Sequence, residues 1–446
     1  MKAHPSKTGL SELSLGLTLW LACLGASQAQ SLVELYESAR DFDATFQSAR
    51  LQYEANLARA EQGKAGMRST ANLSAGMNYT QQDSNSAALR RNFDTQSVTA
   101  SASHPIYRPA NQAAYDQALK QVDAAKAQLE VAEQELILRL SQAYFDVLGA
   151  QDNLLAVQAQ RTAVAEQLAS AKRRFEVGTA TIVDTRQAQA TFDRIEASRI
   201  QAENDLAVRR LALDQLVGRT GTQPRALATP VRLMPVEGDI NRWVEDAQTR
   251  HPIVRSAQTT LSIAELEVLR AEAGHKPTLD ATASHTFTQT PRGNASSALV
   301  NRVNSTAIGL SFNLPLFAGY ATQNRIKETL ALSEKARSDL EGIKRTVAQS
   351  TRSAYFTLIS GQSRVQALQA AETSAQSLVD STRLGYQVGV TINLDVLDAQ
   401  SQLFQTRRDL ALARYEVLVG GLRLKQASGL LGLSDLQAIN TLLVKP

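Results

Sequence analysis

The sequence contains a single cysteine, Cys23, and this residue lies in an N-terminal stretch with the pattern of a secretory signal. A charged start is followed by an apolar run over residues 13–24 and a small-residue motif that ends at Ala29. We expect residues 1–29 to be a signal peptide cleaved after Ala29. Lipid modification of Cys23 is the less favoured alternative, because the preceding residues match the required Leu-rich box poorly. A mature chain without cysteine excludes a disulfide framework and thiol chemistry.

Aromatic residues are scarce, at 5%, although hydrophobic residues make up 43% of the chain. Compact globular cores usually depend on Phe, Tyr and Trp, whereas long helices do not. Ala, Leu, Gln, Glu, Arg and Ser dominate instead, a composition typical of helices. After residue 30 there is no apolar run of about 18 residues, so we expect no membrane-spanning helix. A membrane role would have to use strands or another chain.

The sequence also lacks concentrated charge and catalytic motifs. It has 47 basic and 43 acidic residues, a net charge of +4, and no basic block, so we expect no nucleic-acid partner. It contains no phosphate-binding loop and no nucleophile elbow. The histidines of the mature chain are not paired at metal-binding spacing: His104, His251, His275 and His285. We therefore expect neither an enzyme nor a cofactor or resident metal.

A duplication is the most informative feature that is present. RFEVGTATIVDTRQAQ at residues 174–189 is matched by GYQVGVTINLDVLDAQ at residues 385–400, 211 positions later. Gly218 and Gly429 are also 211 apart, and the offset falls only to 208 near the start of the repeat. The chain therefore contains one unit of about 210 residues written twice, which predicts pseudo-symmetry within one protomer.

The duplication divides the mature chain into a first repeat (30–218), a connecting segment (219–239), a second repeat (240–429) and a tail (430–446). We expect the connecting segment and the tail to form a belt around the helices. Each repeat has the same order of elements: a helical segment, two alternating segments, a very long helix, a Val-Gly turn and a shorter helix. The expected helices cover residues 32–66, 111–174 and 181–217, and residues 240–274, 321–384 and 391–428.

The long helices have a heptad pattern. In the first one, apolar residues recur in alternating steps of four and three, the signature of a coiled coil: Leu136, Leu140, Ala143, Val147, Ala150, Leu154 and Val157. About 64 residues at 1.5 Å each make a rod of roughly 95 Å, too long for one compact domain. The two shorter helical segments of a repeat, stacked end to end, would cover one long helix.

Four segments of about ten residues alternate strictly between apolar and small polar side chains: residues 71–80, 97–106, 278–288 and 305–316. This is the length and period of a tilted strand that crosses a bilayer. A soluble sheet with one wet face has the same period, but two hairpins are too few to form one. We expect Pro105 and Pro315 to redirect each hairpin into the following helix.

Four strands cannot close around a pore, and open edges are not tolerated in lipid. Several copies must therefore contribute, and three copies would supply twelve strands, an even number within the known range. The loops at residues 81–96 and 289–304 are rich in Ser, Asn and Arg, as expected on the exterior side. The sequence thus predicts a mainly α protein with a β-barrel part: a trimeric twelve-stranded barrel continued by a long helical barrel.

This order of parts resembles the TolC family of outer membrane efflux and type I secretion channels. The stretches that carry the resemblance are GHKPTLDATAS (274–284), GLSFNLPLFAG (309–319), RFEVGTATIVD (174–184) and GYQVGVTINLDVLDA (385–399). The resemblance implies a homotrimer in the outer membrane with a periplasmic extension. It also implies a periplasmic adaptor and an inner membrane transporter as partners, with substrate passed directly to the exterior. The alternative is a periplasmic coiled-coil adaptor or scaffold.

The resemblance places both Val-Gly turns at the periplasmic tip. The residues implied in adaptor contact are Val177, Gly178, Thr179, Val388, Gly389 and Val390. Those implied in the gate and pore constriction are Asp184, Tyr386, Asp395 and Asp398. Three copies of the last two would form acidic rings that attract cations.

The sequence departs from the family where an Arg after the second turn latches the gate, because Val390-Thr391-Ile392 stands there. Arg186 is a weak candidate for a substitute. Local structure offers an alternative for two of the acids. Thr181 and Asp184 fit a helix capping box, and Asp395 would lie in a first helical turn. The turn glycines are expected to need positive φ.

Overall fold

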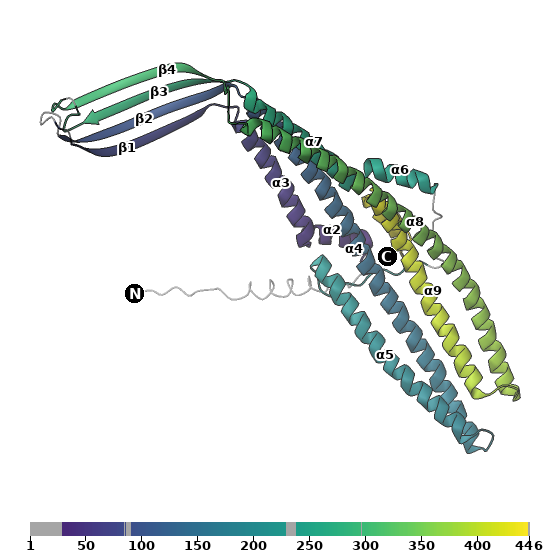
Figure 1. Ribbon diagram of the computed structural model, residues 1–446. Coiled ribbons are helices and arrows are strands. Elements are labelled where there is room, and N and C mark those ends of the chain that lie inside the picture. Colours follow the sequence, from purple (N-terminus) through teal and green to yellow (C-terminus); the bar gives the residue numbers. More distant parts are fainter. Residues whose placement is uncertain (1–28, 84, 86–90, 229–237, 296, 445–446) are drawn as a thin grey trace, which may run out of the picture.

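The computed structural model describes residues 29–83, 85, 91–228, 238–295 and 297–444. The predicted signal peptide up to residue 28, Cys23 and much of the predicted connecting segment lie outside these residues. A four-stranded sheet occupies one end of the molecule, and a layer of long helices extends away from it to two helical turns at the opposite end (Figure 1).

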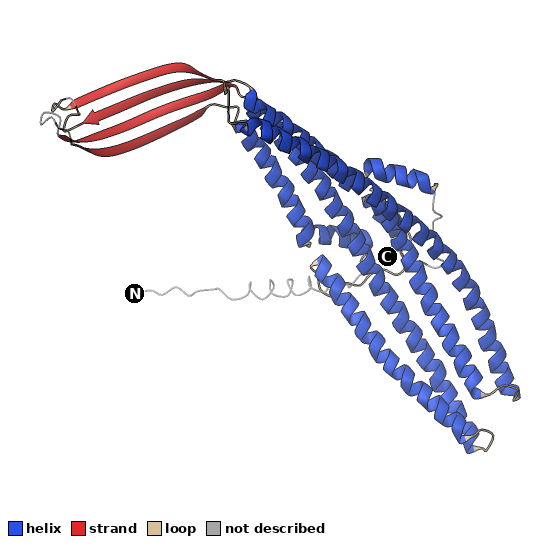
Figure 2. Ribbon diagram, viewed as in Figure 1, coloured by secondary structure: helices blue, strands red, loops and turns tan. Residues whose placement is uncertain are grey.

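The four strands form one antiparallel sheet in the order β1-β2-β3-β4 (Figure 2). Their bounds are Thr70–Gln82, Arg91–Tyr107, Thr278–Thr290 and Asn301–Asn313. The central pairing, β2 with β3, joins the first repeat to the second. The edges β1 and β4 have no neighbouring strand within the described chain.

The predicted strand segments are present, but their bounds were wrong. The strands have 13 to 17 residues. The loop predicted at 81–96 is shorter, because β2 already begins at Arg91 and extends the hairpin beyond the apolar band. The loop predicted at 289–304 is likewise shortened by the extension of β3 and β4. The last strand ends at Asn313, ahead of Pro315, which cannot donate to a ladder.

Two helices of 68 residues each, α4 (Pro109–Glu176) and α8 (Ala321–Val388), run the length of the helical layer. Shorter helices pack end to end along them, as predicted: α3 (Ala44–Ala65) and α5 (Ile182–Val217) against α4, and α7 (Pro252–Glu272) and α9 (Asn393–Ala427) against α8. Helices α7 and α9 also contact α4 and lie between the two long helices. Within the described part of the chain, no helix is both long and apolar enough to cross a membrane.

The first helical segment of each repeat is broken, which the prediction of one continuous segment missed. Helix α2 (Leu32–Phe42) ends before Asp43, and α6 (Ile240–Arg250) ends before His251, its counterpart 208 residues later. Both residues are extended and cap the next helix: Asp43 accepts from the Phe46 N–H at 2.8 Å, and His251 Nδ1 accepts from the Ile253 N–H at 3.1 Å. Pro252 also disfavours a helical conformation at His251.

The predicted heptad seam of α4 is confirmed. Leu136, Leu140 and Val147 are fully buried, and the pattern continues toward the turn. At mid-length, side chains from α2, α5, α9 and α10 (Leu433–Asn440) converge on this seam in the largest core cluster. Bridges from Gln30 to Pro224 and from Leu227 to Leu443 bring the described part of the connecting segment and the tail to the same level.

Candidate functional site

The two faces of the sheet differ in chemistry. Paired side chains form rows across all four strands, such as Ala71, Ala102, Ala283 and Ile308 on one face and Ser74, Thr99, Thr286 and Ser305 on the other. The hydroxyls of Thr99 and Thr286 lie 3.1 Å apart. An apolar face backed by small polar side chains suits a strand with lipid on one side and water on the other.

Polar side chains interrupt the apolar face, among them His285 and Thr306, which pair with each other. His285 pairs across the sheet with Ala100 and Thr306, and its Nδ1 lies 2.8 Å from the Thr306 hydroxyl. The partner on the neighbouring strand satisfies the ring nitrogen, which lowers the cost of its position among apolar side chains.

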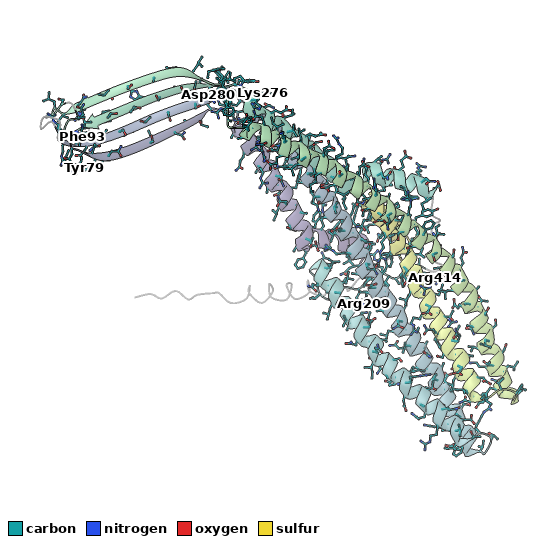
Figure 3. All side chains as sticks on the ribbon, in the orientation of Figure 1. Tyr79, Phe93, Arg209, Lys276, Asp280 and Arg414 are labelled. Atoms are coloured by element: carbon teal, nitrogen blue, oxygen red, sulfur yellow. The ribbon has the colours of Figure 1, made fainter. Side chains whose placement is uncertain are left out.

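A charged clamp joins the sheet to the helices. The Arg108 guanidinium, at the start of α4, donates to both carboxylate oxygens of Asp280 on β3 at 2.7 and 2.6 Å. Asp280 and Lys276 lie at this junction, whereas Tyr79 and Phe93 lie at the far end of the sheet (Figure 3). Beside the clamp the β2–β3 register shifts between Pro105 and Tyr107, where the strand turns toward the helix. The bidentate pair fixes the direction in which α4 leaves the sheet.

A broad hollow of about 1090 Å³ lies between α4, α5, α8 and α9. On α4 the hollow is lined by the polar residues Gln142, Asp146 and Asn153, and also by Phe145 and Ala150 of the core cluster. Acidic and basic side chains are balanced along it: Asp146, Asp205 and Glu416 against Arg209, Arg408 and Arg423. This face is a candidate pore wall with mixed charge.

The two helical turns have the same backbone geometry. Gly178 and Gly389 have φ of 76° and 81°, as predicted for both. In each turn a backbone N–H reaches back five residues, from Thr179 to the Arg174 carbonyl and from Val390 to the Gly385 carbonyl, both at 2.8 Å. This is the Schellman closure of a helix C-terminus, which favours glycine at the left-handed position.

Apolar side chains are exposed at both turns. The first turn presents Phe175, Val177, Ile182 and Val183, and the second presents Leu384, Val388, Val390 and Ile392. Such side chains gathered at the far end of a helical hairpin form a patch suited to another protein.

The predicted gate acids fall into two groups. Asp184 is part of a reciprocal capping box with Thr181, as the capping interpretation predicted: it accepts from the Thr181 N–H at 2.9 Å, and the Thr181 hydroxyl accepts from the Asp184 N–H at 3.2 Å. Asp395 accepts from the Ile392 N–H at 3.1 Å, and Asp398 has no side-chain hydrogen bond or ion pair in the described structure. Asp395 and Asp398 are both exposed, one turn apart on α9.

Tyr386 contacts a residue that the sequence did not point to. The Arg174 guanidinium carbon lies 4.4 Å from the centre of the Tyr386 ring, a cation–π contact between the ends of α4 and α8. Within one chain, no hydrogen bond joins Tyr386 to the three gate acids. Arg186, the weak candidate for a latch, is exposed and makes no ion pair with a described residue.

Comparison with known proteins identifies the architecture. Residues 35–219 and 243–430 match the profile of a family described as outer membrane efflux protein. The chain belongs to this family. It is 30% identical to the outer membrane protein TolC of Vibrio cholerae serotype O1 over 92% of this chain and 93% of that protein. It is 26% identical to the proteases secretion protein PrtF of Dickeya chrysanthemi, over 93% of this chain and 91% of PrtF.

Solved structures agree on the fold. The outer membrane protein VceC from Vibrio cholerae has a TM-score of 0.76 at 18% identity and covers 89% of this chain and 96% of its own. The channel OprN has a TM-score of 0.77 at 18% identity, with 89% of each chain covered. The predicted fold class and the predicted family are therefore confirmed.

This outer membrane efflux family member is an outer membrane channel of the class used in efflux and type I secretion. The channel interpretation is thus preferred to the periplasmic scaffold. Members of the family are channels, not enzymes. The protein is located in the outer membrane of a Gram-negative bacterium.

Proposed function

We propose that three copies of the chain close into one conduit and that the helical turns receive a periplasmic adaptor coupled to an inner membrane transporter. The observation that carries the trimer is the open sheet, whose edges β1 and β4 both present unpaired backbone groups. In lipid such edges must be paired, and pairing β4 of one copy with β1 of the next satisfies both. Three copies give a twelve-stranded barrel with its apolar face toward outer membrane lipid.

The helical layer supports the same closure. Helix α8, which contacts α7 and α9, exposes Phe356 and Ile359, and α5, which contacts α4, exposes Ile200 and Leu211. These apolar rows lie on the two outer helices of the layer. Pairing them between copies would bury both and continue the barrel below the membrane.

The turns would lie at the periplasmic entrance. Their exposed apolar side chains would contact the adaptor, with Val177, Gly178 and Thr179 in one turn and Val388, Gly389 and Val390 in the other. Six such turns would surround the entrance of a trimer. Tyr386 and Asp184 would belong to the gate, and Asp395 and Asp398 would line the constriction as acidic rings. The substrate would pass from the transporter to the exterior without release into the periplasm.

The test is assembly and conductance of the purified protein in detergent and in planar lipid bilayers. We expect a trimer by light scattering and discrete single-channel steps. Phe356→Asp should shift the protein toward monomer and abolish the steps. Leu155→Asp is the matched control, because Leu155 is similarly exposed, at 58% against 61%, but lies on the central helix α4. A monomeric wild-type protein, or one that needs no detergent, would contradict the proposal.

A further inference from the structure

The two helical hairpins of one protomer, α4–α5 and α8–α9, meet where α4 contacts α9. At mid-length this joint is well packed. The rings of Phe145 and Tyr415 stack 5.6 Å apart, and the Tyr415 hydroxyl donates to Asp152 at 2.6 Å. Burial raises the pKa of the Asp152 carboxyl, consistent with an enclosed site. The α4–α9 contact is therefore stabilised by apolar packing and a buried hydrogen bond at mid-length.

Toward the turns the same joint becomes polar. Leu397 is the α9 side chain that joins the buried α4–α5 cluster there. Asn393 and Gln400 lie one turn to either side of it, at 1% and 2% exposure. Gln167 Nε2 donates to Asn393 Oδ1, but Asn393 Nδ2 and Gln400 Oε1 have no partner. Buried polar atoms without partners weaken an interface, and water would satisfy them if the hairpins separated.

The stacking of Arg174 on Tyr386 spans this weak end of the joint. Arg174 lies in the last turn of α4 and Tyr386 in the last turn of α8, so the contact ties one hairpin directly to the other. Both residues are only partly buried, and Arg174 makes no ion pair with a described residue. The contact can therefore break without leaving a buried charge.

The stretch that lacks the latch Arg, Val390-Thr391-Ile392, has one polar side chain, Thr391, and this side chain cannot replace the contact. The Thr391 hydroxyl donates to the Thr382 carbonyl at 3.0 Å, within its own hairpin. Its side chain thus closes the second turn and does not reach α4.

We propose that Arg174 is the gate clasp of this channel. It holds the two hairpins of each protomer together through Tyr386, across a polar α4–α9 stripe, Asn393 and Gln400, that favours their separation. The inference rests on the proposed channel with its entrance at the turns. Closure then depends on the aromatic ring of Tyr386, because a cation–π contact needs no hydroxyl.

Single-channel recordings of the trimer in planar bilayers test the clasp. Arg174→Ala should raise the open probability or mean conductance about two- to fivefold, the range expected for a partly exposed cation–π contact. Arg173→Ala is the matched control, since this neighbour carries the same charge without a partner among the described residues. Tyr386→Phe should stay as closed as the wild type, and Tyr386→Leu should open like Arg174→Ala.

The polar stripe is tested with a variant that should make the channel open less often. Gln400→Leu removes an unpartnered buried oxygen beside Leu397, so it should lower the open probability. Equal conductance of Arg174→Ala and Arg173→Ala, or opening by Tyr386→Phe equal to that of Tyr386→Leu, would overturn the clasp. A Gln400→Leu channel as open as the wild type would overturn the stripe. Absence of wild-type channels would instead contradict the proposed function, and it is measured first.

Discussion

The two turns are built on the same backbone but differ in chemistry. Each closes on a left-handed glycine with a five-residue return bond. At the first turn Thr181 and Asp184 satisfy each other, whereas at the second Ile392 stands in place of the threonine and has no hydroxyl to offer. The two copies of the repeat therefore share the glycine geometry of the turn, whereas only the first copy has the full cap. The acids of the second turn are consequently freer for another role.

The acids of the two turns should differ most in how much they contribute to block of the channel by a divalent cation. The double variant Asp395→Asn/Asp398→Asn removes six carboxylates from a trimer, so the half-blocking concentration of a divalent cation should rise roughly tenfold or more. Asp184→Asn should change it little, because that carboxylate is engaged in a cap. Bilayer conductance with calcium titrated on the entrance side measures both. Equal effects of the two changes would remove the distinction between the turns.

Changes to the helix caps should have smaller effects on stability, with opposite signs at the two turns. Thr181→Ala should destabilise the start of α5 by about 1 kcal/mol, and Ile392→Thr should stabilise the start of α9 by about 0.5 kcal/mol by supplying the missing hydroxyl. Amide hydrogen exchange of the first-turn peptides reports each change separately. Ile392→Val is the control, since it alters size without adding an acceptor. Faster exchange in Ile392→Thr than in Ile392→Val would contradict the capping argument.

The smallest expected effect is a difference between the two helix breaks in how their stability depends on pH. Burial lowers the pKa of His251, and its neutral Nδ1 accepts the capping bond. Because the folded pKa is depressed, this stabilising contribution is present above the ordinary value of 6.5 and is lost as pH falls through the lower folded value. Exchange at the α6–α7 break should therefore increase on acidification to about pH 5, by about 0.5 kcal/mol.

The break at Asp43, which has no histidine, serves as the internal reference. His251→Asn keeps a capping side chain that does not titrate in this range, so it should remove the pH dependence. An unchanged acid response in His251→Asn would show that another group is responsible.

Sequence patterns predicted the architecture because each can be recognised without knowing tertiary contacts. The heptad seam of α4 and the strand alternation are read from neighbouring residues, and the duplication is found by comparing two stretches 211 residues apart. The Thr181–Asp184 cap was predictable for the same reason. The breaks at Asp43 and His251 were missed, although His251-Pro252 carried a usable signal.

The contacts of the candidate site were harder to predict from the sequence. Contact between Arg174 and Tyr386 depends on how two hairpins, 212 residues apart in the chain, lie against each other. The burial of Asn393 and Gln400 follows from the position of α9 between α4 and α8, which no local pattern states. Their spacing of seven around Leu397 is a heptad signal that could have marked them as interface residues.

The pairing of β2 with β3 has a consequence for how the protein is made. His104 pairs with Ala281, so the centre of the sheet forms only after 176 intervening residues have been synthesised and exported. Contacts of such long range are slow to form, whereas the α4–α5 hairpin can fold from one contiguous segment. The edge of β2 that later pairs with β3 should therefore first be exposed in the periplasm, where its backbone groups need protection from aggregation.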